Sequence, residues 1–317
     1  MGGSAVCGLF SCEKSKTTTV DKDIRTLDKN IQKDAEIKPK RTKKNDIAEN
    51  IYNKKKHTRE WDAIDNLELD VHLTEHCNLN CKGCCHFAPL AKKEFLHPSE
   101  FERDISKFSE ILNHKIQLLQ LLGGEPLLHP NVTSFFPIAR KNFPGSSICI
   151  VTNGILLKSM NRQFWKACRK DDIMIYVSKY DIDIDIKSVK AKARKHGVTI
   201  VYTPWNTWYK ISLDLNGGDK SKCEYNFARC FGSHSTTLKH GKIYNCFLMA
   251  HIEHFNKYFN QNLKPAESDI LDIYKTKDSI ALKRFLERPK DFCKYCHIPF
   301  NVSEWSHPSK KNISEWT

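Results

Sequence analysis

The chain has 317 residues and a formal net charge of +14 at pH 7, with 51 Lys and Arg against 37 Asp and Glu. No apolar run approaches the roughly 20 residues that a membrane span needs. The first residues, MGGSAVCGLFSC, lack the basic-then-apolar order of a signal peptide. These features exclude a membrane-spanning protein and lead us to expect a cytoplasmic one.

The 13 cysteines bear on the kind of chemistry to expect. The cytosol keeps thiols reduced, so metal binding or thiol chemistry is a better default than a disulfide framework. Much of the positive charge lies within residues 1–60, which are polar and show no sustained apolar period. We therefore predict a disordered basic N-terminal tail over 1–60, and we do not expect a nucleic-acid partner.

From Trp61 onward, short apolar strands alternate with amphipathic helices. Strands are predicted at 67–73, 115–122, 146–154, 173–178 and 198–204. Ser99 and Glu102 predict a capping box for the first helix, whose apolar residues repeat at helical spacing. Further helices are predicted from about 131 to Phe143, over 162–169, and up to Gly197. This alternation is typical of a parallel α/β sheet or barrel over residues 61–214.

Four cysteines crowd into the stretch HCNLNCKGCC, directly after the first predicted strand. Cys77, Cys81 and Cys84 have the spacing C-x3-C-x2-C. Zinc sites usually gather four ligands as two close pairs, so this loop is one ligand short unless Cys85 or His86 contributes. A cubane iron–sulfur cluster held by three thiolates keeps one iron open instead. We interpret Cys85, which directly follows a predicted ligand, as a packing or supporting residue.

This loop resembles the signature of the radical S-adenosylmethionine (radical SAM) superfamily. The resemblance implies a partial (β/α)6 barrel in which Cys77, Cys81 and Cys84 hold a [4Fe-4S] cluster whose open iron chelates SAM. It also implies an electron donor such as flavodoxin or ferredoxin. One feature departs from the family pattern, because Gly83 stands where an aromatic residue usually precedes the last cysteine.

Two further motifs support the resemblance. In LLGGEPLL, Gly123, Gly124 and Glu125 end the second strand, where the superfamily binds the SAM ammonium group. In IVTNG, Thr152 and Asn153 end the third strand and are implied to reach the ribose or the methionyl carboxylate. Ser178 is a further candidate for the ribose. In a barrel of parallel strands the active site lies at the carboxyl ends of the strands, where all these residues fall.

From about Leu213 the alternation stops and cysteines return, which predicts a second, smaller α+β unit over 215–317. The pattern C-x10-G-x4-C followed by C-x2-C resembles the twitch domain, a shortened SPASM domain. The resemblance implies one auxiliary [4Fe-4S] cluster, and a four-thiolate zinc site is the alternative. Cys223 is open as a bystander, an alternative ligand or a hydrogen-atom donor. The ligands implied for the auxiliary cluster are Cys230, Cys246, Cys293 and Cys296.

Cys149 lies on a predicted buried strand and Cys168 on an apolar helix face, so both are predicted core residues. The motifs CKGCCHFAPLA and LLGGEPLLHP resemble radical SAM proteins of carbohydrate and polysaccharide biosynthesis. We therefore expect abstraction of a hydrogen atom from a small polar substrate, such as a carbohydrate, leading to dehydrogenation or epimerisation. Radical modification of a ribosomally made peptide is an alternative. A zinc protein that binds nucleic acid is a more remote one.

Overall fold

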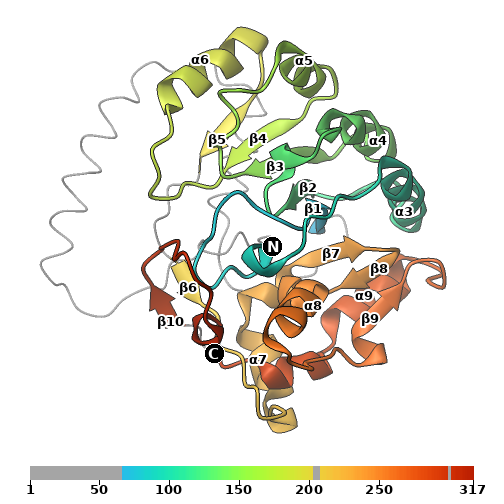
Figure 1. Ribbon diagram of the computed structural model, residues 1–317. Coiled ribbons are helices and arrows are strands. Elements are labelled where there is room, and N and C mark those ends of the chain that lie inside the picture. The colour runs from blue at the N-terminus through green and yellow to red at the C-terminus, as the bar shows by residue number, and fades with distance from the viewer. Residues whose placement is uncertain (1–65, 203–207, 299–300) are drawn as a thin grey trace, which may run out of the picture. The chain divides into compact units, whose positions relative to one another are not determined.

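The computed structural model describes residues 66–202, 208–298 and 301–317, all within one compact unit (Figure 1). The tail predicted over residues 1–60 lies outside the described residues. The predicted strand–helix alternation is confirmed. Five strands run parallel in the order β5-β4-β3-β2-β1. They are β1 (Glu68–Thr74), β2 (Leu118–Gly123), β3 (Ser147–Thr152), β4 (Met174–Val177) and β5 (Ile200–Tyr202).

Four helices connect these strands and lie on their outer side (Figure 1). They are α3 (Pro98–Ile111), α4 (Phe135–Asn142), α5 (Arg162–Lys170) and α6 (Ile186–His196). Leu69, Val71 and Leu73 of β1 join the same hydrophobic core as Phe101 and Phe108 of α3. Because side chains alternate along a strand, Asp70 and His72 lie on the opposite face of the sheet. The α/β class and the partial barrel of parallel units are confirmed.

The N-terminus of α3 differs from the prediction. The helix begins at Pro98, and its N-cap is His97, whose Nδ1 accepts a hydrogen bond from the backbone N–H of Ser99 at 3.3 Å. The capping box predicted from Ser99 and Glu102 is therefore wrong, because Ser99 already lies inside the helix. Proline is favoured in the first turn, since its missing N–H has no intrahelical partner there. The end of α6 at Gly197, which has φ 65°, is as predicted.

The second half of the chain extends the same sheet. Strand β7 (Thr236–Lys239) pairs in parallel with β1, and β8 (Lys242–Tyr244) and β9 (Ile270–Asp272) follow as antiparallel strands. The sheet is thus continuous across the boundary predicted between 214 and 215, and the division into two domains stays a prediction. The helices here are α7 (Cys223–Arg229), α8 (Phe247–Phe259) and α9 (Ser279–Glu287).

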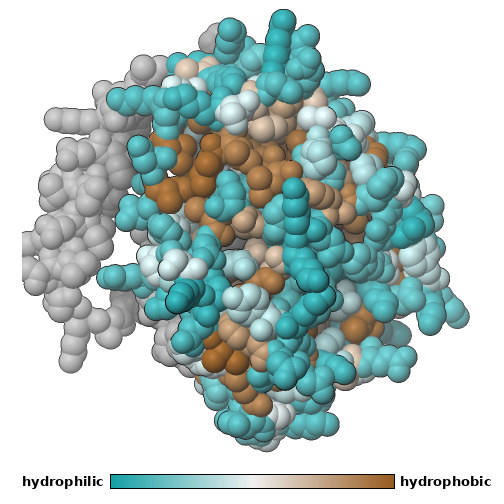
Figure 2. All heavy atoms as spheres, viewed as in Figure 1, coloured by the Kyte–Doolittle hydropathy of each residue, from teal (hydrophilic) through white to brown (hydrophobic). Residues whose placement is uncertain are grey.

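Two short strands, β6 (Trp208–Lys210) and β10 (Asn301–Ser303), form a separate antiparallel pair. Polar side chains cover the outer helices, and hydrophobic side chains gather over the region of β3 to β5 (Figure 2). Within the described part of the chain, no helix has the length and apolar content to cross a membrane. Short 3-10 helices occupy Ala88–Leu90, Pro126–Leu128, Val132–Ser134, Lys220–Lys222, Phe231–His234, Glu267–Asp269, Asp291–Tyr295 and Ile313–Glu315.

Candidate functional site

The three predicted cluster ligands lie in the loop that leaves the carboxyl end of β1. Cys81 is buried, whereas Cys77 and Cys84 are partly exposed. Burial raises the pKa of the Cys81 thiol to about 12, with the neighbouring Cys84 adding to the effect. Burial also raises the pKa of Cys77, to which Glu125, Cys84 and Cys81 contribute. The three thiols therefore share poorly solvated surroundings, which disfavour the thiolate form.

Zinc and a cubane iron–sulfur cluster differ in how closely they bring thiolate ligands together. A Zn–S bond is about 2.3 Å long, so two thiolates on one zinc ion stand no more than about 4.6 Å apart. Among the described residues, the group of three or more metal-binding side chains whose ligand atoms all lie within 4.8 Å of one another contains no cysteine. In a cubane cluster each thiolate binds a different iron, and the choice between such a cluster and zinc at these thiols stays a prediction.

The glycine pair at the end of β2 packs directly on the start of the cysteine loop. A Cβ atom added to Gly123 would lie 2.2 Å from the carbonyl oxygen of Thr74, and one added to Gly124 would lie 2.1 Å from that of His76. Gly123 also has φ 146°. Only glycine allows this approach, so the pair brings β2 against the residues that lead into Cys77.

Glu125 connects this region to the end of β3. Its fully buried carboxylate accepts hydrogen bonds from the hydroxyl of Thr152 at 2.7 Å, the backbone N–H of Asn153 at 2.9 Å and that of Leu127 at 3.0 Å. Burial raises the pKa of Glu125 to about 7, although these donors oppose the shift. The structure gives Glu125 a positioning role, and its predicted contact with SAM stays a prediction.

Asn153 brings the end of β3 to the cysteine loop. Its side-chain amide donates to Oδ1 of Asn78 at 2.7 Å and lies 3.8 Å from Sγ of Cys77. Ser178, which follows β4, is buried, and its backbone N–H donates to the carbonyl oxygen of Thr152 at 2.9 Å. The predicted residues of β1, β2, β3 and β4 therefore do converge at one end of the sheet, while their contacts with SAM stay predictions.

The last residues, 304–317, which we call the C-terminal segment, pack on the cysteine loop. The indole N–H of Trp305 donates to Sγ of Cys81 at 3.2 Å, and that of Trp316 donates to the carbonyl oxygen of Cys84 at 2.9 Å. The buried ammonium group of Lys311 donates to the carbonyl oxygens of Asn80 and Cys81 at 2.9 and 3.3 Å. This segment therefore fixes the shape of the loop from one side.

The same packing explains the glycine that departs from the family pattern. Gly83 has φ 60°, and an added Cβ would lie 2.8 Å from the carbonyl oxygen of Glu315. An aromatic residue has no room at this position. The aromatic ring of Tyr180 instead lies 5.5 Å from that of Trp305, and burial together with Cys81 and Cys84 raises the pKa of its hydroxyl.

Sequence reasoning missed Trp305, Lys311 and Tyr180. Trp305 and Lys311 lie in an aromatic and basic C-terminal stretch without cysteines, which is only a weak indication of a functional role. They are also 224 or more residues away in sequence from the loop residues that they contact. Tyr180 follows Ser178 by two residues, beyond the carboxyl end of β4. That position was the one feature of the sequence that could have indicated a place in the site.

The second cysteine set surrounds the β7–β8 hairpin. Cys230 follows α7, Cys246 is the N-cap residue of α8, and Cys293 and Cys296 lie on and just after the 3-10 helix Asp291–Tyr295. Burial raises the pKa of Cys246 and of Cys293 to about 12 each. Each of these thiols acts electrostatically on Cys296. The choice between an auxiliary [4Fe-4S] cluster and a four-thiolate zinc site here stays a prediction.

Two buried polar side chains hold the Cys293–Cys296 turn. The side-chain amide of Asn226 donates to the carbonyl oxygens of Cys293 and Cys296 at 2.9 and 2.7 Å. Asp269 accepts hydrogen bonds from the backbone N–H groups of Asp291 and Phe292 at 2.8 and 2.9 Å. This support is what a preorganised ligand loop needs.

The remaining cysteines have different surroundings. Cys223 lies with the second set, where its Sγ is 3.6 Å from the carbonyl oxygen of Asp291. Its predicted role as a hydrogen-atom donor stays a prediction. Cys85 is buried in a hydrophobic cluster with Phe87 and Trp316, and its role as a packing or supporting residue stays a prediction. Cys149 and Cys168 are core residues, as predicted.

Comparison with known proteins finds similarities for the first half of the chain. A family model described as a 4Fe-4S single cluster domain matches residues 70–199. The chain is 31% identical over 94 residues to the GTP 3',8-cyclase of Aquifex aeolicus (strain VF5), spanning 28% of each chain. It is 33% identical over 101 residues to molybdenum cofactor biosynthesis protein 1 of Bos taurus, spanning 31% of this chain and 16% of that one. It thus spans less than a third of the length of these relatives.

Two solved structures superpose on the chain with low TM-scores. BtrN in complex with AdoMet and 2-DOIA has a TM-score of 0.47 at 14% identity and covers 74% of this chain and 94% of its own. Streptococcus suis SuiB bound to S-adenosylmethionine has a TM-score of 0.33 at 15% identity and covers 43% and 32%. TM-scores below 0.5 do not establish a shared fold or a shared function.

Residues 70–199 thus match a 4Fe-4S single cluster domain, and the three predicted cluster thiols lie within this range, after the carboxyl end of β1. Residues from the ends of β2, β3 and β4 gather beside these thiols. Over residues 70–199 the chain is thus similar to 4Fe-4S single cluster domains, and its membership of the radical SAM superfamily stays a prediction.

Proposed function

We propose that this enzyme removes a hydrogen atom from a carbon of a small polar substrate, a carbohydrate in the first place, and oxidises it by two electrons. Cys77, Cys81 and Cys84 would hold a [4Fe-4S] cluster, which together with SAM would supply the 5'-deoxyadenosyl radical chemistry needed for hydrogen-atom abstraction. The observation that carries the proposal is the bridge from Cys77 through Asn153 and Thr152 to Glu125. It aligns three strand ends around the cysteine loop.

We assign two further roles to residues of the chain, the orientation of polar groups and the exclusion of water. Asn153 and Thr152, held by Glu125, orient polar groups toward the space beside Cys77. The C-terminal segment covers the loop and limits the access of water to Cys81, which is 5% exposed. Exclusion of water protects a reactive radical from side reactions.

The second cysteine set supports dehydrogenation over epimerisation. After loss of a hydrogen atom, a substrate radical becomes a ketone by losing one proton and one electron. Cys230, Cys246, Cys293 and Cys296 offer four thiols, the full ligand number of an auxiliary [4Fe-4S] cluster that accepts such an electron. An external reductant such as flavodoxin or ferredoxin supplies the first electron. The relatives named GTP 3',8-cyclase match too little of the chain for their substrate to be transferred to it.

The experiment is turnover with perdeuterated sugars and aminocyclitols as probes, with dithionite as reductant. Deuterium in 5'-deoxyadenosine identifies a sugar as the substrate, and a product three mass units lighter than the perdeuterated substrate, from loss of one carbon-bound deuterium and one hydroxyl proton, identifies dehydrogenation. A product with solvent protium in place of deuterium at an inverted carbon, not formed by Cys223→Ala, identifies epimerisation and contradicts the proposed reaction. Deuterium transfer from a peptide but from none of the sugars contradicts the proposed substrate class.

A further inference from the structure

A buried group of histidine and glutamate side chains lies between β1 and α8. His72 is on β1, Glu75 follows the strand, and His251 is on α8. One potential ligand atom from each lies within 4.8 Å of the other two. Their side chains are 4%, 11% and 0% exposed, respectively. The rings of His72 and His251 are stacked, with centroids 3.7 Å apart. We call these three residues the His–Glu cluster.

Hydrogen bonding within the cluster is incomplete. Oε2 of Glu75 accepts hydrogen bonds from His251 Nδ1 at 3.0 Å and His254 Nε2 at 2.6 Å. His72 Nδ1 stands 3.7 Å from Oε1 of Glu75, too far for a hydrogen bond, and is buried without a partner among the described residues. Nε2 of His251 is likewise unpaired within that part of the chain. Burying a nitrogen atom without a hydrogen-bond partner costs free energy of folding, so such atoms in a folded protein need an explanation.

A positive charge already stands at this position. Nζ of Lys239 lies 3.4 Å from Oε1 of Glu75 and 3.3 Å from Nδ1 of His251. It also lies 2.7 Å from the carboxylate of Glu253, whose side chain is 63% exposed. A metal ion that entered the cluster would leave Lys239 a carboxylate partner at the surface. The cluster therefore attracts a cation. Lys239, which now supplies the positive charge, would still be paired with the carboxylate of Glu253.

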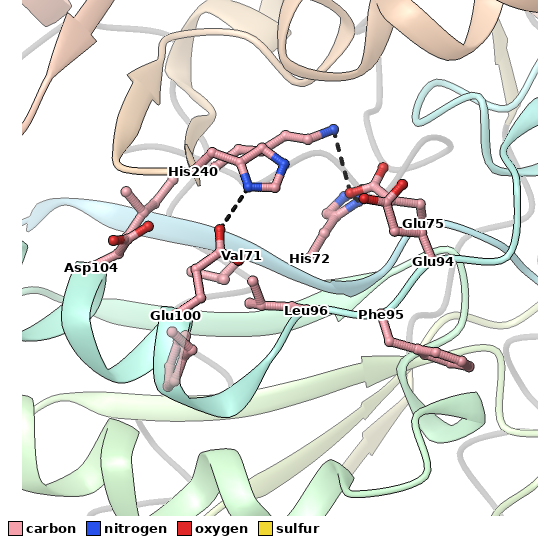
Figure 3. A pocket seen from close by; sticks show the side chains of 12 residues that line it. Val71, His72, Glu75, Glu94, Phe95, Leu96, Glu100, Asp104 and His240 are labelled. Atoms are coloured by element: carbon pink, nitrogen blue, oxygen red, sulfur yellow. Dashed lines mark hydrogen bonds and ion pairs between the residues drawn. The ribbon is translucent and has the colours of Figure 1, made fainter.

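The protonation state and the access route also suit a metal ion. Burial lowers the pKa of His72 and of His251, which favours the neutral imidazoles that coordinate metals. A pocket of about 70 Å³, lined by His72, Glu75 and Lys239 together with Glu94 and Glu100, adjoins the cluster (Figure 3). This volume holds about two water molecules, so an ion would have an open position.

We propose that His72, Glu75 and His251 bind one zinc ion, at a site separate from both cysteine sets. Two imidazoles and one carboxylate form a His₂Glu ligand set, which leaves the fourth position of a tetrahedral zinc ion for water or another ligand. His254, hydrogen-bonded to Glu75, would orient that carboxylate. Bound zinc would also tie Glu75, two residues before Cys77, to α8.

The test uses full-length protein with its iron–sulfur clusters reconstituted, titrated with Co²⁺ as a spectroscopic probe and then with Zn²⁺. We expect one Co²⁺ per chain with visible ligand-field bands and without a thiolate-to-cobalt charge-transfer band, displaced by one Zn²⁺. His72→Ala and His251→Ala should each weaken binding at least tenfold. His240→Ala is the matched control, because His240 lines the same pocket but bonds to Glu100.

A second variant keeps the proposal testable if the histidine variants fail to fold. Lys239→Met removes the competing ammonium group and should tighten Co²⁺ binding at least threefold. Unchanged or weaker binding in Lys239→Met would overturn the proposal. So would a thiolate charge-transfer band from the bound ion, or no Co²⁺ bound to the wild-type protein. Retention of the expected iron content in each variant shows that the cysteine sites are intact.

Discussion

The indole N–H of Trp305 donates a hydrogen bond of 3.2 Å to Sγ of Cys81, across 224 residues of chain. Hydrogen bonds to ligand sulfur atoms help to set the reduction potential of an iron–sulfur cluster, because they stabilise the more negative, reduced state. A residue of the C-terminal segment thus contacts a predicted ligand of the SAM-binding cluster directly.

Trp305→Phe should lower the reduction potential of that cluster by on the order of 60 mV, the one-electron equivalent of about 1.4 kcal/mol for a charge-assisted hydrogen bond. Redox titration followed by electron paramagnetic resonance measures the change. Trp316→Phe is the matched control, because the Trp316 indole donates to the backbone carbonyl of Cys84 and not to sulfur. Equal shifts in the two variants would show that packing, and not the bond to sulfur, sets the potential.

Gly83→Ala should destabilise the protein by about 2 kcal/mol or more. Its φ of 60° is costly for residues with a side chain, and the added Cβ meets the carbonyl oxygen of Glu315. Urea unfolding measures the free energy. Gly217→Ala is the control for backbone strain alone, because Gly217 has φ 94° but nothing within 4 Å of an added Cβ. A loss no larger than that of the control would mean that the C-terminal segment moves aside easily.

Asn226→Ala should remove the auxiliary cluster selectively. The variant loses both hydrogen bonds that hold the Cys293–Cys296 turn, so that iron should fall from about eight to about four per chain while SAM cleavage persists. Iron and sulfide analysis after anaerobic reconstitution measures this. Asn256→Ala, which removes an asparagine that bonds to the backbone of Leu263, should keep all the iron. Loss of SAM cleavage along with the iron in Asn226→Ala would contradict separate sites.

Thr152→Val should weaken SAM binding about tenfold without loss of iron. The valine leaves Oε1 of Glu125 with the Leu127 N–H as its remaining described donor, which costs about 1–2 kcal/mol and loosens Asn153 beside Cys77. Calorimetric titration of SAM into the reconstituted protein measures the affinity. Thr276→Val, which removes a hydroxyl bonded to the carbonyl oxygen of Asp272, is the control. Unchanged SAM affinity in Thr152→Val would separate the Glu125 network from the SAM site.

The sequence predicted the parts of the site whose signals are local. Apolar period, the Gly197 helix end and the three-cysteine spacing each depend on neighbouring residues, and the structure bears out the strands, the helices and the convergence of Gly123, Thr152 and Ser178. The N-cap at His97 was missed because Ser99 is the commoner cap, while Pro98 favours the first turn.

The parts that were missed depend on long-range packing. Trp305 and Cys81, or His251 and Glu75, are too far apart in sequence for any local pattern to bring them together. Glu125 was identified, but the bonds that engage its carboxylate were not, because they depend on the register of β2 against β3. Reasoning from periodicity establishes which residues share an element, and not which distant side chains meet.

The central claim is that Cys77, Cys81 and Cys84 hold a cluster that cleaves SAM reductively. The most direct test is anaerobic reconstitution with iron and sulfide, addition of SAM and dithionite, and quantification of 5'-deoxyadenosine by mass spectrometry. We predict 5'-deoxyadenosine from the wild-type protein and none above background from the variant with Ala at all three positions, which should retain about half the iron. Stoichiometric zinc without iron uptake, or equal 5'-deoxyadenosine from both proteins, would contradict the claim.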